Sequence, residues 1–265
     1  MIPMLGALMR PIFYGEVKTM WDGKMKAVTF SYDDGVWQDR RLVELFDKYG
    51  LKATFNLNSG RLGRAEDYAT YFGRTICVDT VRADEIKTLY AGHEVAAHTL
   101  THPNLTRCPD EEIVRQVEQD RLALSELVGY EVVGMAYPCG GENNNDHVAR
   151  IIREDTGIRY ARTITSTGSF ERPQNYFRLD PTCYHLADST SPYGMSAKMD
   201  GLMERAEAFL RADSGLFYIW GHSYEFDLFD GAWERFEAFC AAISGKSDVF
   251  YGTNRDILLN SDCNF

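Results

Sequence analysis

Strand-like and helix-like segments alternate along almost the whole chain, and this alternation restricts the possible folds more than any other feature of the sequence. The strand-like runs are rich in β-branched and aromatic residues and are bounded by turn-forming residues. They span residues 27–32, 53–57, 94–98, 132–137, 160–163, 176–179, 216–220 and 249–251. Repeated units of a strand followed by a helix imply a parallel sheet, and this many units imply an α/β fold with a barrel or a broken barrel.

Amphipathic helices are expected between several of these strands. Residues 42–49 and 233–243 carry apolar side chains at intervals of three or four positions. A helix over 109–128 begins with acidic residues, which suit the positive end of a helix dipole, and a further helix is expected over 197–211. Residues 163–196 are irregular and rich in Ser, Thr, Pro and Asp, so we expect long loops there, at the mouth of the barrel.

The composition favours one folded domain that avoids anionic polymers. Hydrophobic residues make up 45% of the 265 residues, enough for a sizeable core, and no linker, charge block or low-complexity tract divides the chain. We therefore expect a single domain over residues 1–265, with its core at about residues 27–252. A net charge of -11 argues against binding to nucleic acids or anionic membranes, so neutral or cationic substrates suit this surface better.

The sequence also bears on the location of the protein. Residues 1–14 lack the basic start, the long apolar core and the small-residue cleavage site of a signal peptide. No run approaches the roughly 18 apolar residues of a membrane span, and the six cysteines form no CxxC pair. These features predict a cytoplasmic protein with reduced thiols, or a secreted or cell-envelope protein if a leader has been removed. The oligomeric state stays open.

Three polar segments each follow a predicted strand, and together they predict one open metal site. Asp33-Asp34-Gly35 follows the first strand, His98-Thr-Leu-Thr-His102 ends the third, and His222 follows the strand at 216–220. The carboxyl ends of barrel strands lie on one face, where active sites are built. One carboxylate and two imidazoles leave a divalent ion positions for water and substrate, while a second carboxylate and a third histidine could move protons. This combination indicates metal-assisted hydrolysis.

Each of these segments also has a purely structural interpretation. An Asp-Asp-Gly sequence is usually a turn, paired histidines can be core or surface residues, and a lone histidine is more often structural than catalytic. The metal interpretation is favoured because adjacent carboxylates repel each other unless a cation neutralises them. Tyr137, Trp220 and Tyr224 are candidates for a substrate pocket beside His222, although core packing or a solvated loop also explains such residues. The remaining histidines are interpreted as structural: His93, His147 and His185.

At these residues the sequence resembles the polysaccharide deacetylases, the NodB-homology group also called carbohydrate esterase family 4. The T-F-D-D-G-like motif of that family resembles Thr29 to Gly35, where Ser31 and Tyr32 stand between Phe30 and the Asp pair, and the H-[ST]-x-x-H motif matches His98 to His102. The resemblance runs from about residue 27 to residue 252 and implies a distorted (β/α) barrel. It also implies that Asp33 is the catalytic base and His222 the catalytic acid, and that Asp34, His98 and His102 bind the metal.

Two segments depart from the pattern of the family. The R-x-P-Y-G-like motif corresponds to residues 135–140, where Ala136 stands near the place of the arginine and Cys139 near that of the tyrosine. Arg162, at the end of the next strand, is a candidate to replace the arginine that orients the catalytic aspartate. Asp180 is a candidate for the aspartate that pairs with the late histidine. The backbone N–H of Cys139 is expected to stabilise the oxyanion.

The resemblance implies a hydrolase that removes an N-acetyl or O-acetyl group from a carbohydrate, such as an acetylated amino-sugar oligomer or polymer. Its cofactor is expected to be a divalent metal, foremost Zn²⁺, with Co²⁺ and Ni²⁺ as alternatives. Neither a nucleic acid nor a membrane is an expected partner. Two other functions stay open: a hydrolase of a small cyclic amide or ureide, similar to an allantoinase, and a catalytically silent carbohydrate-binding barrel.

Overall fold

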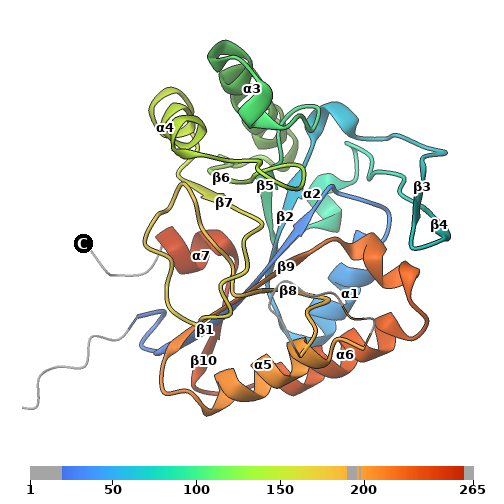
Figure 1. Cartoon of the computed structure of the whole chain (residues 1–265), viewed down its shortest axis with the longest axis vertical. Coiled ribbons are helices and arrows are strands. Elements are labelled where there is room, and N and C mark those ends of the chain that lie inside the picture. Colours follow the sequence, from blue (N-terminus) through green and yellow to red (C-terminus); the bar gives the residue numbers. More distant parts are fainter. Residues whose placement is uncertain (1–19, 190–195, 197, 260–265) are drawn as a thin grey trace, which may run out of the picture.

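The computed structural model describes residues 20–189, 196 and 198–259, which form a curled sheet with helices packed around it (Figure 1). The strand order is β7-β6-β5-β2-β1-β9-β8, β10 pairs with the first part of β1, and all of these pairs are parallel. The bounds are β1 Lys26–Asp33, β2 Ala53–Leu57, β5 Glu94–Ala97, β6 Gly134–Ala136, β7 Tyr160–Arg162, β8 Cys183–Tyr184, β9 Gly215–Gly221 and β10 Val249–Tyr251. Within the described residues no ladder joins β7 to β8, so the barrel is open there. The predicted distorted α/β barrel is confirmed.

Helices connect most of the consecutive strands. They are α1 Asp39–Tyr49, α2 Ile86–Leu89, α3 Asp110–Val128, α4 Asp146–Asp155, α5 Asp200–Arg211, α6 Ala232–Ile243 and α7 Asn254–Leu259, with the 3₁₀ helices η1 Ser59–Arg61, η2 Leu105–Arg107 and η3 Ser223–Leu228. Helices α1, α5 and α6 lie together beside one part of the sheet, and α3 and α4 pack together beside another (Figure 1). The helix predicted over 197–211 begins at Asp200, and Ala197 lies outside the described residues. None of the described helices combines the length and apolarity needed to cross a bilayer.

The central strand β1 explains how the sheet delivers a carboxylate to the barrel interior. All of its residues are buried, as expected for a strand of a parallel sheet that is covered on both faces. Phe30 packs against the helices, with its ring centroid 4.7 Å from that of Phe46 and 6.4 Å from that of Phe236. Because successive side chains alternate between the two faces of a strand, Ser31 and Asp33 point into the barrel, where both accept hydrogen bonds from Arg162.

Two predictions about the irregular part of the chain need correction. The strand predicted over 176–179 is wrong, because this segment forms only an isolated bridge, between Leu179 and Arg162. The segment predicted as loops over 163–196 contains one short strand, β8, which pairs with the end of β9. Both differences arise where the barrel is open. Whether a segment forms a strand there depends on which other segments it can pair with, rather than on its own sequence pattern.

An antiparallel hairpin of β3 (Tyr68–Tyr71) and β4 (Arg74–Cys77) stands beside the main sheet and was not predicted (Figure 1). Most of its residues are exposed, so it lacks the apolar alternation by which half-buried strands are recognised. One of its side chains, Tyr71, stacks on Tyr224 with the ring centroids 5.7 Å apart. The hairpin therefore reaches the loops at the carboxyl ends of the barrel strands.

Candidate active site and metal centre

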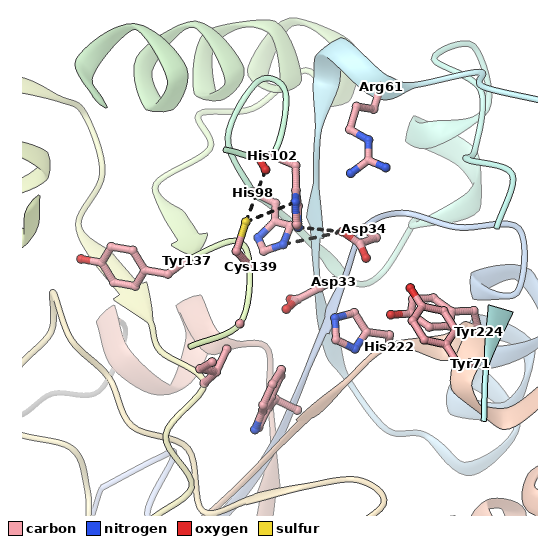
Figure 2. Close-up of a pocket in the computed structure, with 13 residues that line it drawn as sticks. Asp33, Asp34, Arg61, Tyr71, His98, His102, Tyr137, Cys139, His222 and Tyr224 are labelled. Carbon is pink, nitrogen blue, oxygen red and sulfur yellow. Dashed lines mark hydrogen bonds and ion pairs between the residues drawn. The ribbon is translucent and has the colours of Figure 1, made fainter. Parts of the chain in front are cut away.

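Polar side chains at the carboxyl ends of neighbouring strands line one cavity of about 430 Å³ (Figure 2). The lining residues are Asp33, Asp34, Arg61, Tyr71, His98, His102, Tyr137, Cys139, Gly140, Ile164, Trp220, His222 and Tyr224. The three sequence segments that were predicted to form one site all contribute to this cavity. The aromatic residues predicted to lie beside His222 also line it, although the hydroxyl of Tyr137 donates a hydrogen bond to the carbonyl of Phe177 at 2.7 Å.

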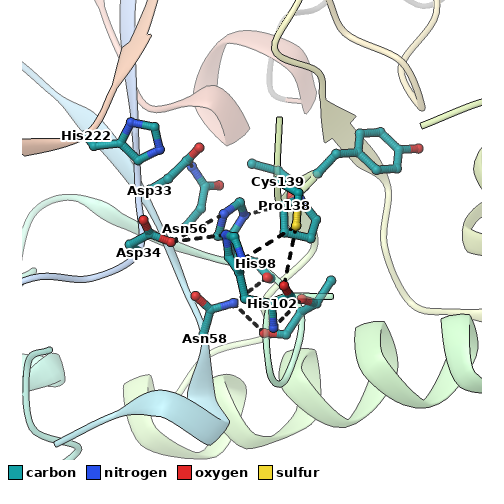
Figure 3. Close-up of polar contacts among 12 residues, drawn as sticks. Asp33, Asp34, Asn56, Asn58, His98, His102, Pro138, Cys139 and His222 are labelled. Atoms are coloured by element: carbon teal, nitrogen blue, oxygen red, sulfur yellow. Dashed lines mark hydrogen bonds and ion pairs between the residues drawn. The ribbon is translucent and has the colours of Figure 1, made fainter. Parts of the chain in front are cut away.

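Asp34, His98 and His102 offer one donor atom each, and these atoms lie within 4.8 Å of one another. The Nε2 atoms of His98 and His102 are 3.7 and 3.4 Å from Asp34 Oδ1 (Figure 3). Asp34 Oδ1 is buried and accepts no hydrogen bond from any described residue, although buried carboxylate oxygens usually find a partner. A divalent cation would satisfy this oxygen. The donor set, one carboxylate and two imidazoles, fits Zn²⁺ or a similar ion with positions left open.

Hydrogen bonds orient the two histidines toward Asp34. His98 Nδ1 donates to the carbonyl of Ala136 at 2.9 Å, which leaves the lone pair of Nε2 directed into the site. The backbone N–H of His102 donates to Thr99 Oγ1 at 3.1 Å, and Asn58 Nδ2 donates to the carbonyls of His98 and Thr99. These bonds close the loop that carries both imidazoles.

The backbone of this region adopts left-handed conformations at non-glycine residues. Asp34 has φ 78°, Thr99 has φ 68° and His102 has φ 67°. Such conformations cost energy, and they cluster at functional sites, where surrounding contacts enforce them. At Asp34 this turn directs its carboxylate away from that of Asp33. Gly35, with φ 62°, completes the turn, and a Cβ there would approach Leu57 Cδ2 to 2.6 Å.

Asp120 of α3 supports the histidine loop and was not predicted as a site residue, although an acidic residue between Val117 and Leu124 on the buried face of a helix is unusual. Its buried carboxylate accepts hydrogen bonds from the backbone N–H groups of Ser59 at 2.6 Å and His98 at 2.9 Å. Burial raises the pKa of Asp120 to about 7, although these donors act in the opposite direction. This carboxylate therefore links the end of β2 to the end of β5.

Asp33 is held in a fully formed network. Arg162 Nη2 donates to both of its carboxylate oxygens, and Asn56 Nδ2 donates to Oδ1 at 2.9 Å. Burial acts to raise the pKa of Asp33, but the charges of Arg162, His98 and His222 outweigh burial and lower it. Asp33 is therefore ionised near neutral pH.

Arg162 reaches Asp33 from the end of β7, which lies next to β6. The segment that departs from the family pattern begins on β6. In the parallel pairing of β6 and β7, Ala136 and Arg162 are register partners. The arginine expected near position 136 is thus displaced by one strand at the same level of the sheet, and the small side chain of Ala136 leaves room for it. The guanidinium also lies over the ring of Trp220, 4.7 Å from its centroid, which positions it further.

His222 is paired with Glu225, so the expected pairing of His222 with Asp180 is wrong. His222 Nδ1 lies 3.3 Å from Glu225 Oε2, which also accepts a hydrogen bond from His185 Nε2 at 2.7 Å. Asp180 instead accepts a hydrogen bond from the hydroxyl of Thr163. Glu225 can pair with His222 because η3 follows His222 directly, and residues three apart in a 3₁₀ helix lie above one another.

The pKa of His222 reflects these surroundings. Burial acts to lower it, but the charge of Glu225, with the charges of Asp34 and Asp33, raises it to about 9. His222 is therefore protonated at neutral pH. His185, interpreted as structural, is buried between Glu225 and Tyr32, whose hydroxyl lies 3.2 Å from His185 Nδ1.

Cys139 lines the cavity at the turn after β6 with a left-handed φ of 70°. Its Sγ lies 3.7 Å from His102 Nδ1. Asn143 Nδ2 donates to the carbonyls of Tyr137, Pro138 and Cys139, which fixes the turn. Among the described residues, none accepts a hydrogen bond from the Cys139 N–H. This donor is thus free to meet a substrate oxygen.

Comparison with known proteins agrees with this geometry. The sequence model of the family described as polysaccharide deacetylase matches residues 22–161, more than half of the 265-residue chain. The chain belongs to the polysaccharide deacetylase family. The resemblance noted from the sequence motifs is therefore confirmed, and the match includes the Asp pair and the His98–His102 loop.

Similar members of the family and of the fold come from several bacteria. Over 122 residues the chain is 26% identical to the peptidoglycan-N-acetylmuramic acid deacetylase PdaC of Bacillus subtilis. This aligned region covers 46% of this chain and 26% of that protein. A crystal structure of a putative polysaccharide deacetylase from Mycobacterium smegmatis superposes with a TM-score of 0.62, at 19% identity, over 89% of this chain and 90% of that one. A pseudoenzyme of the CE4 family from Bacillus anthracis superposes with a TM-score of 0.54, at 18% identity, over 88% and 66% of the two chains. The chain thus spans about a quarter of the curated relative, and the structures show the shared fold.

Proposed function

We propose that this chain is a metal-dependent hydrolase that removes acetyl groups, foremost N-acetyl groups, from a carbohydrate. One observation carries the proposal: a metal-type donor set, an ionised carboxylate and a protonated histidine share a single cavity. Hydrolysis of an amide needs an activated water and a proton for the leaving nitrogen. The cavity offers a group for each task.

Asp34, His98 and His102 would hold the ion, with Zn²⁺ as the first candidate and Co²⁺ or Ni²⁺ as alternatives. When bound, such an ion polarises the acetyl carbonyl and lowers the pKa of water. The hydrogen bond from His98 Nδ1 to Ala136 keeps Nε2 available as a ligand. Thr99 and Asn58 hold the loop in the conformation that brings His102 to the same point.

Asp33 would act as the general base. Its carboxylate is ionised and lines the cavity next to the donor set. Arg162 and Asn56 fix its orientation, and Asn56 engages Oδ1 alone, which leaves Oδ2 as the oxygen that receives the proton of the attacking water. Because both partners are buried, the carboxylate keeps this orientation without rearrangement during the reaction.

His222 would donate a proton from its imidazolium to the leaving nitrogen. Glu225 keeps His222 protonated through an ion pair at Nδ1, so Nε2–H is the proton that would be delivered. The free backbone N–H of Cys139 would donate a hydrogen bond to the oxyanion that develops from the carbonyl. Tyr137, Trp220 and Tyr224 would form walls against which the sugar packs.

The fold alone does not establish catalysis, because a structure of the same fold is described as a pseudoenzyme. This chain keeps an acid, a base and a complete donor set in contact with one cavity, which supports an active enzyme over a silent carbohydrate-binding barrel. No observation favours a cyclic amide or ureide over an acetylated sugar.

The proposal is tested by measuring bound metal and released acetate on the same preparation. We expect mass spectrometry to find about one divalent ion per chain, and we expect acetate release from chitooligosaccharides, acetylxylan or peptidoglycan to stop when a chelator removes the ion and to return with Zn²⁺. Allantoin serves as the comparison substrate. A protein that binds no divalent ion, or one that opens allantoin and releases no acetate, would refute the proposal.

A further inference from the structure

Arg61 has a property that the proposed mechanism does not use. It lines the catalytic cavity, and its side chain forms no hydrogen bond or ion pair with any described residue. Its Nε atom is buried and lacks an acceptor. A buried guanidinium nitrogen without a partner is unusual, because each such group loses its hydration without compensation. Figure 2 shows the guanidinium directed toward the side of the cavity that holds Asp34 and His102.

The backbone around Arg61 is fixed relative to the histidine loop. The N–H of Gly60 donates to the carbonyl of Leu100 at 3.0 Å, and that of Arg61 donates to the carbonyl of Asn58 at 2.9 Å. A Cβ at position 60 would lie 2.5 Å from the Leu100 oxygen, so only glycine permits this approach. Leu100 lies between the two metal-type histidines. The distance of Arg61 from the reacting centre is therefore set by main-chain contacts rather than by a mobile loop.

The charge of Arg61 contrasts with that of the other arginine close to the site. Arg162 is neutralised by Asp33 in a buried ion pair, so it has no capacity left for a ligand. Arg61 forms no such pair among the described residues, Asp34 included. In a chain with a net charge of -11, an uncompensated cation at the catalytic cavity creates a local site for one anionic group.

We propose that Arg61 binds an anionic substituent of the acetylated sugar, a carboxylate or a phosphate ester close to the acetyl group. This inference rests on the proposed function and narrows its substrate class. The planar guanidinium presents paired N–H donors that match the two oxygens of a carboxylate or phosphate. A single anionic group on the reacting sugar would be attracted by Arg61, whereas a densely charged polymer would still be repelled by the acidic surface.

The test compares matched substrates in wild type and Arg61→Gln. The neutral substrate is an N-acetylglucosamine oligomer. One anionic counterpart carries N-acetylmuramic acid, which adds a carboxylate, and the other carries N-acetylglucosamine 6-phosphate. We expect wild type to prefer one anionic substrate, and the ratio of its kcat/KM to that of the neutral substrate to fall about 10- to 100-fold in Arg61→Gln, mainly through KM. Which counterpart responds identifies the anion.

Arg64→Gln is the matched control, because Arg64 lies three residues away, is half-exposed, and approaches Asp67 at 3.7 Å outside the cavity. This variant should keep the wild-type substrate ratio. Arg61→Lys should lose part of the preference, since an ammonium keeps the charge without the paired donors. The inference is overturned if wild type shows no preference for either anionic substrate, or if Arg61→Gln keeps the wild-type ratio.

Failure of the proposed function can be told apart from failure of this inference. Acetate release from the neutral oligomer with an unchanged ratio in Arg61→Gln would reject the role of Arg61 and leave the hydrolase intact. If no substrate releases acetate, the proposed function fails. Calorimetric titration of N-acetylmuramic acid and N-acetylglucosamine 6-phosphate into both proteins then decides the inference, because binding weakened at least tenfold by Arg61→Gln supports it and equal or undetectable binding in both rejects it.

Discussion

Asp33 and Asp34 are neighbours in the chain, yet their carboxylates lie in opposite environments. Asp33 is 2% exposed, and both of its carboxylate oxygens accept hydrogen bonds: Arg162 donates to both, and Asn56 donates to Oδ1. Asp34 has a buried oxygen that accepts no hydrogen bond from the described residues, and it faces two imidazoles. The strand directs Asp33 into the barrel, and the left-handed turn at Asp34 carries the next carboxylate to the adjacent loop.

This difference shows how one dipeptide can serve two chemical tasks. A carboxylate whose protein partners are complete stays ionised and fixed, which suits a base. A carboxylate left without donors beside two imidazoles is prepared for a cation that the protein itself does not supply. The two roles therefore follow from which partners the fold provides, since the side chains are chemically identical.

The largest expected effect comes from neutralising each aspartate in turn. Asp33→Asn should lower kcat about 10²- to 10⁴-fold, the usual contribution of a general base, while bound zinc stays near the wild-type amount. Asp34→Asn should lose activity together with the metal, because a neutral amide is a poor ligand for Zn²⁺. Metal content by mass spectrometry and acetate release measure both quantities. If Asp33→Asn also lost its metal, or if Asp34→Asn retained it, the division of roles would be wrong.

Removal of Arg162 should affect both rate and stability. Arg162→Met leaves Asp33 buried without its cation, and breaking a buried pair in this way costs about 3–5 kcal/mol of unfolding free energy. The pKa of Asp33 should rise for the same reason, so less of the base is ionised. Urea denaturation measures the first effect, and kcat against pH measures the second.

A double variant separates these two effects. Asp33→Asn combined with Arg162→Met removes the uncompensated charge, so it should regain part of the lost stability and remain inactive. Lys48→Met, which removes an exposed partner of Glu237, should leave the denaturation midpoint nearly unchanged. An Arg162→Met enzyme with the wild-type rate would show that Asp33 needs no orienting cation.

A smaller effect is expected at the acid side of the site. His222 is surrounded by Glu225, Asp33, Asp34 and, through Glu225, His185. A bound cation offsets the charge of Asp34, so Glu225 is the main group that holds the pKa of His222 near 9. The protonated form, which is the acid, is lost as pH rises through that value. In Glu225→Gln the pKa should fall toward 6.5, and the alkaline limb of the pH–rate profile should move in the acid direction.

NMR titration of His222 measures its pKa, and kcat at a series of pH values measures the alkaline limb. Glu237→Gln is the matched control, because Glu237 lies on α6 and pairs with Lys48 at the surface. Its pH profile should follow wild type. An unchanged alkaline limb in Glu225→Gln would mean that another group donates the proton.

The sequence predicted those parts of the site that depend on strand periodicity. Asp33, His98 and His222 follow apolar runs, and parallel strands place such positions at one edge. Arg162 could be proposed because it ends the strand after the one that carries Ala136. The partner of His222 was not predicted, because Glu225 reaches it through the short 3₁₀ helix that directly follows β9, and the sequence of this loop does not indicate that helix. Loop contacts of this kind have no period in the sequence.

Residues outside that pattern were missed for a related reason. Asp120 lies on the buried face of α3, between Val117 and Leu124, so its spacing is that of a buried residue, but the spacing does not identify the backbone N–H groups that its carboxylate meets. Arg61 and Tyr71 lie in segments without apolar alternation. Their approach to the cavity depends on a main-chain contact at Gly60 and on a side-chain stack with Tyr224. Tertiary contacts decide which groups these side chains meet, and the local pattern does not identify those partners.

The smallest expected effect lies at the rim of the cavity, away from both aspartates. Tyr71 is 41% exposed and stacks on Tyr224 with an interplanar angle of 14°, so its other face is open to a sugar ring. Tyr71→Ala removes that surface and loosens Tyr224, which should raise KM about 3- to 10-fold, equivalent to about 0.6–1.4 kcal/mol. The kcat value and the metal content should follow wild type, because no contact of Asp33 or Asp34 changes. Tyr68→Ala on the same hairpin, 64% exposed and outside the cavity lining, should keep the wild-type KM. A fall in kcat without a change in KM would instead mean that the hairpin acts on the reacting centre, and the separation between the rim and the two carboxylates would be lost.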